Sequence, residues 1–395
     1  MKMIMLSPFT PYPPDSGGRI RQWEFIKCLG KRHDLTLVFF INRGEEKMLQ
    51  GAFDGICSRV ETVTHAGDVD LSGPQSLPWP MRAYGVDAMK KLLSDLSADR
   101  YDLLLIDFIY MAQHRFLFDI PAVLHEHNIE SSLYKQYAEL PNVKDMEIFG
   151  LHKEALFWKA TWMLMRQYEN KIWPAFDLRL TVSRLDQMEM ESRCPDGKTI
   201  VAENGVSTQG IRLLPASRSK KILFVGTMNY FPNVDGALFM VQSIMPLVWQ
   251  RDPDIRLCIA GREIPRHIRE FGADSRIEIV SDFPDIHDIA AGCCLSVVPL
   301  RLGGGTRIKI LEAFALGLPV VSTAKGCEGL AIEDGRHLIV RDEPDAFAEA
   351  VALLANDPQL ADSLRGNGRR LVEERYDWQK IFEAAEEQMV RLVQA

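Results

Sequence analysis

The sequence predicts an α/β fold made of two doubly wound parallel-sheet domains. Its 395 residues exceed the size of one ordinary hydrophobic core, so two domains are expected. Short apolar strands alternate with helical stretches along the chain, which is the pattern of parallel sheets joined by helical crossovers. The alternation stops around 204–219 and then starts again, which indicates two successive domains of similar size.

Each strand is expected where a short apolar run lies between polar or glycine-containing segments. In the first half these runs are 3–6, 35–40, 59–63, 103–107, 122–125 and 178–182. In the second half they are 221–225, 256–260, 277–280, 295–299, 319–322 and 338–340.

The segment between the two series contains Asn204, Gly205 and Pro215 among polar residues, which is typical of a connector. The last stretch has the apolar spacing of an amphipathic helix. We therefore expect three parts: an N-terminal domain, a C-terminal domain and a terminal helix, at 1–203, 204–377 and 378–395.

Composition narrows the class of protein. The chain is 47% apolar and 25% charged, as in soluble globular proteins, and its net charge of −8 argues against a nucleic-acid partner. The seven cysteines show no CxxC spacing, which is typical of reduced thiols in a cytosolic protein. We expect a cytoplasmic protein, because no apolar run approaches the length that crosses a bilayer.

The stretch 303–323 holds the most informative motif. Three successive glycines follow the expected strand 295–299, and a helix is expected to begin near Thr306. Arg307 and Lys309 would then lie in its first turn, where the helix dipole disfavours cations unless an anion is bound. A tight turn with surface cations is the alternative, but two cations beside bare glycine backbone favour a phosphate site.

This stretch resembles the donor-site block of the GT-B glycosyltransferases, in particular family 4. Glu312 matches the glutamate that holds the donor ribose in that family, and Gly304 stands where the first Glu of its Glu-x7-Glu pair is usual. The resemblance implies two Rossmann-like domains that face a central cleft, and sugar transfer from a nucleotide diphosphate with retention of configuration. The donor-binding residues that it implies here are Gly304, Gly305, Thr306, Arg307, Lys309 and Glu312.

The strand ends of the second half resemble the other donor loops of the family. Thr227 follows Gly226 where an arginine is usual, and Asn233 stands in place of a lysine, so both usual cations are missing. We expect Arg307 and Lys309 to replace them from the neighbouring loop. Further donor contacts that the resemblance implies are Gly226, Thr227, Asn229, Arg262 and Phe283.

In the first half, Gly17 and Gly18 precede a helix expected near Arg19 and permit close approach to the backbone. Their loop resembles the glycine-rich first loop of GT-B enzymes, which lies under the donor phosphates. A rigid turn is the alternative. No GxGxxG is present, which argues against a nicotinamide dinucleotide.

Asp107 ends a buried strand, where a charge needs a partner or a function. Many family members carry a histidine at this strand end, close to the transferred sugar. His125 and His127 end the next strand, on one face by alternation, and we place His127 beside the acceptor hydroxyl and donor sugar. Zinc binding and a purely structural histidine pair are the alternatives, although neither a third neutral ligand nor an HExxH helix is present.

The stretch 150–175 is rich in Trp and Met and carries several basic residues. Interfacial membrane helices have this composition, and so do core helices of α/β proteins. The inner membrane surface is therefore one alternative partner, contacted peripherally.

The sequence predicts a glycosyltransferase that uses a UDP- or GDP-linked sugar and an acceptor hydroxyl, in polysaccharide, glycolipid or glycoconjugate biosynthesis. The resemblance implies no metal or further cofactor, since GT-B enzymes generally need no catalytic metal, and fixed cations would stabilise the departing diphosphate. The alternatives are a non-hydrolysing nucleotide-sugar epimerase and a non-catalytic nucleotide-sugar-binding or partner subunit. The residues expected to act in catalysis are Asp107, His127 and Arg307.

Overall fold

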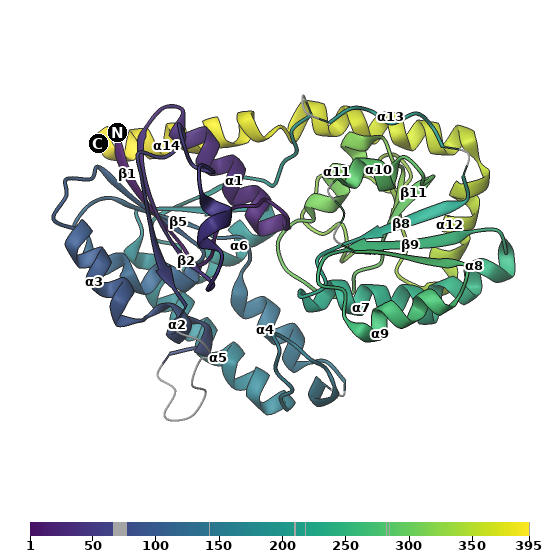
Figure 1. Cartoon of the computed structure of the whole chain (residues 1–395), viewed down its shortest axis with the longest axis horizontal. Coiled ribbons are helices and arrows are strands. Elements are labelled where there is room, and N and C mark those ends of the chain that lie inside the picture. The colour runs from purple at the N-terminus through teal and green to yellow at the C-terminus, as the bar shows by residue number, and fades with distance from the viewer. Residues whose placement is uncertain are drawn as a thin grey trace. The chain divides into compact units, whose positions relative to one another are not determined.

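The computed structural model describes residues 1–65, 77–141, 143–208, 211–217, 219–281, 283 and 285–394. Their strands form two fully parallel sheets, which confirms the α/β fold with two doubly wound domains (Figure 1). The chain divides into two compact units. The first unit comprises Met1–Val143, Glu154–Glu203 and Trp378–Ala395, and the second unit comprises Lys144–Lys153 and Asn204–Asp377.

The first unit holds a sheet of order β3-β2-β1-β4-β5-β6-β7. Its strands are β1 Lys2–Ser7, β2 Asp34–Ile41, β3 Arg59–Thr64, β4 Leu103–Asp107, β5 Ala122–His125, β6 Leu178–Thr181 and β7 Lys198–Val201. Its α-helices are α1 Gly17–Gly30, α2 Trp79–Tyr84, α3 Asp87–Leu96, α4 Glu130–Ala138, α5 Ala155–Ile172, α6 Arg184–Arg193 and α14 Trp378–Gln394.

The second unit holds a sheet of order β10-β9-β8-β11-β12-β13. Its strands are β8 Lys221–Val225, β9 Arg256–Gly261, β10 Ile277–Ser281, β11 Leu295–Val298, β12 Val320–Ser322 and β13 Ile339–Val340. Its α-helices are α7 Phe231–Phe239, α8 Met245–Arg251, α9 Arg266–Arg269, α10 Ile286–Ala290, α11 Ile308–Leu316, α12 Pro344–Asn356 and α13 Pro358–Arg375.

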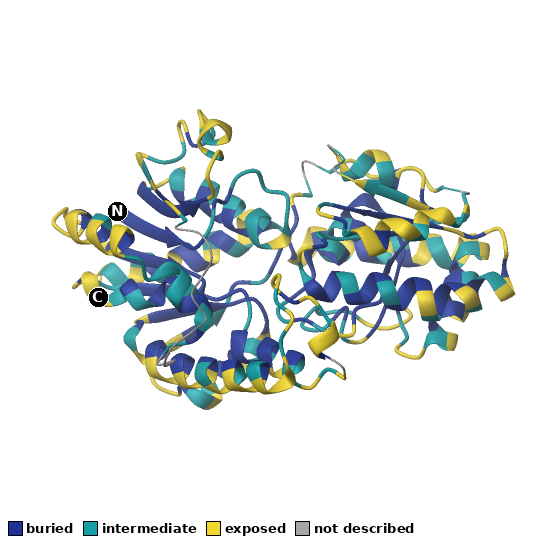
Figure 2. Cartoon of the chain, turned by 60° about the horizontal axis from the view of Figure 1, so that its bottom comes forward, coloured by how far each residue is buried: buried dark blue, intermediate teal, exposed yellow. Residues whose placement is uncertain are grey.

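Every expected strand is present to within two residues at either end, and β7 was missed. The four residues of β7 lie at an edge of the sheet, and only one of them is buried. An edge strand of this kind lacks the continuous apolar run that marks a central parallel strand. Figure 2 shows buried strands inside both sheets: β4 and β11 are buried throughout, and β1 is buried after its first residue.

Helix α14 belongs to the first unit and packs against α1 (Figure 1). The rings of Phe25 and Phe382 stack with centroids 4.6 Å apart. At the end of α1, Arg32 and His33 both contact the carboxylate of Glu386 at 2.8 Å. The chain therefore returns, after the second unit, to complete the core of the first.

Chain order reverses once in each sheet, between β1 and β4 and between β8 and β11. Ligands of open parallel sheets bind outside the carboxyl ends of the strands at such a switch point. In the first unit this edge carries Ser7 and Asp107, and in the second unit it carries Gly226 and the loop after β11. Both glycine-containing loops predicted from the sequence thus leave a sheet at its switch point.

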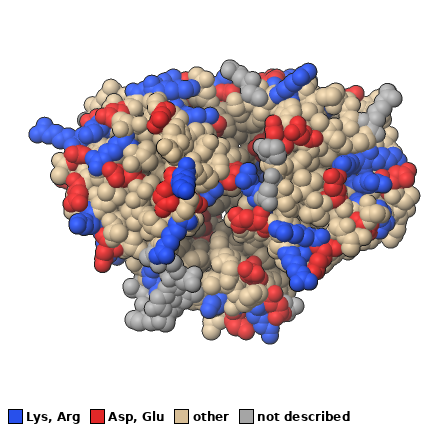
Figure 3. Space-filling model, in the orientation of Figure 1, with Lys and Arg blue, Asp and Glu red and all other residues tan. Residues whose placement is uncertain are grey.

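The surface carries no single-sign field on the face drawn in Figure 3, where basic and acidic side chains are interspersed. This pattern agrees with the modest negative net charge. Within the described residues, none of the helices combines the length and apolar character needed to cross a bilayer.

Candidate functional site

The loop between β11 and α11 needs glycine for its backbone conformation. Gly303 and Gly305 have φ of +123° and +63°, in the region that favours glycine. A side chain at Gly303 would also collide with Arg307, because an added Cβ would lie 2.8 Å from Nη2. Helix α11 begins at Ile308, so the expected start near Thr306 is two residues too early and Arg307 is the N-cap.

Arg307 is folded back over this loop with two of its nitrogens unpaired. The residue is 7% exposed, and Nη1 donates to the carbonyls of Gly304 and Gly305, to the latter at 2.6 Å. Among the described residues, its buried Nε and Nη2 have no hydrogen-bond partner. Buried donors are almost always satisfied in native proteins, and an anion is one partner that two donors of a single guanidinium could share.

Lys309 lies in the first turn of α11 and connects this helix, through Asn233 of α7, to the loop that follows β8. Its Nζ donates to Asn233 Oδ1 at 2.7 Å, and Asn233 Nδ2 donates to the carbonyl of Thr227 at 2.8 Å. Burial, and then the charge of Arg307, lower the pKa of Lys309 to about 7. Burial raises the pKa of the nearby Glu312, against the opposing charge of Lys309. The lysine therefore lies beside the asparagine that occupies the family's lysine position.

The ends of β8 and β9 approach closely at two glycines. An added Cβ on Gly261 would lie 2.1 Å from the carbonyl oxygen of Gly226, and Gly226 N donates to Ala260 O at 3.0 Å. Arg262 follows on the same edge, where its carbonyl accepts from Met228 N at 2.9 Å. The structure therefore brings this predicted residue to the same sheet edge as Gly226.

The remaining residues predicted to contact the donor differ in how far they are buried. Asn229 is exposed, whereas Phe283 packs partly buried against the core of the second unit. Thr306 is buried and accepts from Asn204 Nδ2 through both Oγ1, at 2.8 Å, and its carbonyl, at 3.1 Å. Asn204, the first residue of the second unit's main segment, thus holds the glycine loop in place.

The first unit has its own buried polar site at the ends of β4 and β5. Asp107 Oδ1 lies 2.7 Å from Nδ1 of His125 and 2.9 Å from Nε2 of His127. Its other oxygen accepts from Gln22 Nε2 at 2.5 Å, and Gln22 also donates to Ser7 Oγ at 2.8 Å. All of these groups come from α1 and the carboxyl ends of β1, β4 and β5.

The charges of this site follow from burial and from the partners of each group. Burial favours protonation of Asp107, but the two imidazoles hold its pKa below the usual range. Burial, and then the charge of Arg21, lower the pKa of His125 to about 3. Burial also lowers the pKa of His127. At neutral pH the site therefore holds an ionised carboxylate between two neutral imidazoles.

The sequence predicts that Asp107 acts in catalysis. Its side chain is fully buried and both its oxygens are engaged, so it can act only through a neighbour. His127 is that neighbour, since it is 8% exposed and bonded to the carboxylate.

Asp107, His125 and His127 place three potential ligand atoms within 4.8 Å of one another, as a metal site requires. In the structure these ring nitrogens face the carboxylate itself, and each can bond it only by donating a proton. The cationic Arg21 also lies against His125, at 2.8 Å from Nε2. We call this cluster the relay, because the Asp107 carboxylate bonds His127 and also contacts His125.

Phe108 covers this relay in a strained backbone conformation. Its φ is +64°, which costs a non-glycine residue about 1–3 kcal/mol. Its ring stacks on His127 with centroids 3.7 Å apart. Helix α1 begins at Gly17, two residues before the expected position, and an added Cβ on Gly18 would lie 3.5 Å from the Phe108 ring. Gly18 therefore packs beside the Phe108 ring that stacks on His127.

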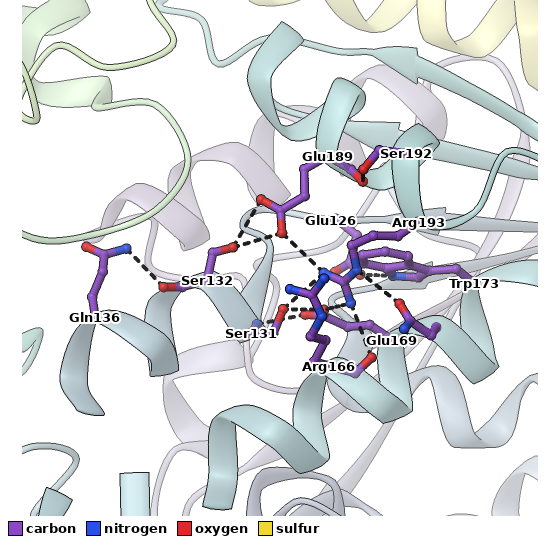
Figure 4. Close-up of polar contacts among 11 residues, drawn as sticks. Glu126, Ser131, Ser132, Gln136, Arg166, Glu169, Trp173, Glu189, Ser192 and Arg193 are labelled. Atoms are coloured by element: carbon purple, nitrogen blue, oxygen red, sulfur yellow. Dashed lines mark hydrogen bonds and ion pairs between the residues drawn. The ribbon is translucent and has the colours of Figure 1, made fainter. Parts of the chain in front are cut away.

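A second buried cluster, drawn in Figure 4, fixes the start of α4 immediately after His127. Glu169 accepts from the backbone N and the Oγ of Ser131, at 2.7 and 2.5 Å, and is paired with Arg193 at 2.5 Å. Glu126, which directly precedes His127, accepts from Trp173 Nε1 at 3.0 Å. These contacts fix the backbone on both sides of His127, at Glu126 and at Ser131.

Sequence reasoning missed Arg21, Gln22 and Ser7, although the relay depends on them. A signal was present: Arg21 and Gln22 stand at the helical spacing of Phe25, Ile26 and Leu29, which form the buried face of α1. Polar residues at core positions of an amphipathic helix need partners, and these partners lie on distant strands.

Comparisons with known proteins agree with this architecture. Residues 219–357 match the family described as Glycosyl transferases group 1. An uncharacterized 44.6 kDa protein in the cps region of Klebsiella pneumoniae is 23% identical over 402 residues, which cover 96% of this chain and 98% of the relative. The GDP-mannose:cellobiosyl-diphosphopolyprenol alpha-mannosyltransferase of Xanthomonas oryzae pv. oryzae is 29% identical over 194 residues, covering 46% and 50% of the two chains.

Solved structures show the same fold over almost the whole length. Anabaena HepE in complex with UDP and glucose superposes with a TM-score of 0.70 and 16% identity, covering 99% of this chain and 100% of HepE. Sucrose-phosphate synthase of Thermosynechococcus elongatus gives a TM-score of 0.70 and 16% identity, covering 99% of each chain. The protein is a glycosyltransferase of the GT-B fold.

Proposed function

We propose that this glycosyltransferase binds the diphosphate of a nucleotide-sugar at the loop between β11 and α11. The observation that carries the proposal is Arg307, whose buried Nε and Nη2 lack partners among the described residues while Nη1 is held by the loop. Phosphate oxygens would satisfy both donors in the planar geometry that guanidinium prefers. Lys309 would add a second cation, and Glu312 the ribose contact implied by the family resemblance.

The reaction we propose is transfer of the sugar to an acceptor hydroxyl with retention of configuration, as in family 4. Negative charge grows on the leaving diphosphate as the glycosidic bond breaks, and Arg307 and Lys309 would stabilise it without a metal. Asp107 would act through His127, which would meet a sugar or acceptor hydroxyl. The Xanthomonas relative, an alpha-mannosyltransferase named for a lipid-linked acceptor, supports a role in polysaccharide or glycolipid synthesis.

Donor turnover tests this proposal. The chain is incubated with UDP-, GDP- and ADP-sugars, and slow release of the nucleoside diphosphate is followed. We expect release from a UDP- or GDP-sugar, with the sugar appearing first as the anomer of the donor by NMR. An altered sugar still attached to its nucleotide would identify an epimerase instead, and tight binding without turnover would identify a binding subunit.

Two variants of the same loop locate the anion. Arg307→Ala removes the orphaned donors and should lower turnover by about 100-fold, the usual effect of losing one such donor. Arg301→Ala is the matched control, because its guanidinium is half exposed and paired with Asp235 at 2.6 Å. Equal turnover in the Arg307 and Arg301 variants would contradict the diphosphate site.

We also propose that the exposed side of α5 contacts an anionic membrane surface. Leu156 and Met163 are 76% and 51% exposed there, and the basic Lys159 and Arg166 are exposed on the same helix. Sedimentation with vesicles of phosphatidylglycerol and phosphatidylcholine should recover the protein, and pure phosphatidylcholine should recover less. Undiminished recovery of the double variant Leu156→Ser/Met163→Ser would refute this surface.

A further inference from the structure

A series of close polar contacts in the first unit connects Arg21 of α1 to His127. Arg21 Nε donates to Nε2 of His125 at 2.8 Å, so this nitrogen offers a lone pair and the proton of neutral His125 lies on Nδ1. Nδ1 lies 2.7 Å from Asp107 Oδ1. The same oxygen lies 2.9 Å from Nε2 of His127, which must therefore donate as well. The hydrogen bond from Arg21 therefore determines which ring nitrogen carries the proton, first in His125 and then in His127.

We propose that Arg21 is a positioning residue that fixes the tautomers of both histidines, so that His127 offers Nδ1 as an acceptor to a sugar or acceptor hydroxyl. The proposal rests on the proposed function, because the hydroxyl belongs to the transfer reaction. Among the described residues, Nδ1 of His127 has no hydrogen-bond partner, and the residue is 8% exposed, whereas His125 and Asp107 are fully buried. The opposite tautomer would present a donor at Nδ1 and leave the Asp107 carboxylate without one of its donors.

Arg21 is held so that it cannot turn away from His125. Its Nη1 and Nη2 donate to the carbonyls of Glu203 and Ala202, at 2.7 and 2.5 Å. Its guanidinium also lies over the rings of Phe382 and Trp378, with 5.3 and 5.9 Å to their centroids. A planar fork can serve a ring nitrogen and two carbonyls together, which the single nitrogen of lysine cannot do. This difference makes Arg21→Lys informative.

The experiment reads the tautomers directly in the full-length chain. Histidine-labelled protein is examined by long-range ¹H–¹⁵N NMR, with the rings assigned from His125→Asn and His127→Asn. The variants are Arg21→Met and Arg21→Lys, the second of which keeps the charge and can still donate to the carbonyls. Arg179→Met is the matched control, because Arg179 is a fully buried arginine of the same unit, bonded to Thr199 and to loop carbonyls.

In the unchanged protein we expect a proton on Nδ1 of His125 and on Nε2 of His127. Both Arg21 variants should lose this single pattern, and their donor turnover should fall at least about tenfold in kcat with little change in KM. The Arg179 variant should keep the pattern. Unchanged tautomers in the Arg21 variants would overturn the inference even if activity fell. If the unchanged protein turned over no donor, the proposed function would fail, while the tautomers would still decide whether Arg21 orders the relay.

Discussion

The binding of a nucleotide-sugar should depend on pH through Lys309. Its pKa is lowered to about 7 by burial and then by the charge of Arg307, so before a donor binds the lysine is about half charged at neutral pH. Bound phosphate oxygens would raise this pKa toward the usual value of about 10.4, and binding would then take up a proton. The sign follows directly: affinity is greatest below pH 7 and falls as pH rises.

The size of the effect follows from the same pKa. Dissociation constants should rise with 1 + 10^(pH − 7), which is about 30-fold between pH 6 and pH 8.5, or about 2 kcal/mol. Titration calorimetry with UDP-glucose and GDP-mannose measures this, because their diphosphate diesters keep a constant charge over that range. Repeating it in buffers of different ionisation enthalpy counts the protons taken up.

Lys309→Arg is the matched variant, since guanidinium stays charged throughout this range. It should bind with an affinity that varies much less with pH, and the remaining slope reports other groups such as Glu312. The reasoning would be wrong if the unchanged protein varied less than about threefold, or if the arginine variant kept the full slope.

Three further predictions concern stability. Burial raises the pKa of Glu130 from 4.5 to about 7, so between these pH values the folded chain binds more protons than the unfolded chain and loses stability as pH rises. In denaturant unfolding, Glu130→Gln should therefore be more stable than the unchanged protein by at most about 3 kcal/mol at pH 8 and equally stable near pH 4.5. A difference that does not vary with pH would contradict this prediction. Gly261→Ala forces a Cβ to 2.1 Å from a backbone carbonyl and should cost about 2–3 kcal/mol, whereas Gly366→Ala on α13, where nothing lies within 4 Å, should be neutral or stabilising by thermal melting. Arg193→Met leaves the buried Glu169 without its ion-pair partner and should cost about 3–5 kcal/mol, much of which the added change Glu169→Gln should restore in the same assay.

The predicted residues of the glycine loop illustrate how far sequence pattern reaches. Glycines after an apolar strand, followed by Arg307 and Lys309, indicated an anion site, because helix starts and bare backbone have a fixed local geometry. The pattern could not say that Arg307 folds back over Gly304 and Gly305, nor that Lys309 reaches Asn233 from another helix. The contact of Lys309 with Asn233 joins residues 76 positions apart, and local periodicity contains no information about it.

By itself, the sequence determined the two parallel sheets, nearly all their strands and the loops that leave their switch points. These features follow from apolar runs and glycines, whose effects act within a few residues. Only the tertiary structure decided which buried polar groups meet: Arg21 with His125, Gln22 with Asp107, and Glu169 with Ser131. Such pairs form because a buried charge or donor must find a partner in space, and which partner it meets depends on how the sheet and its helices pack.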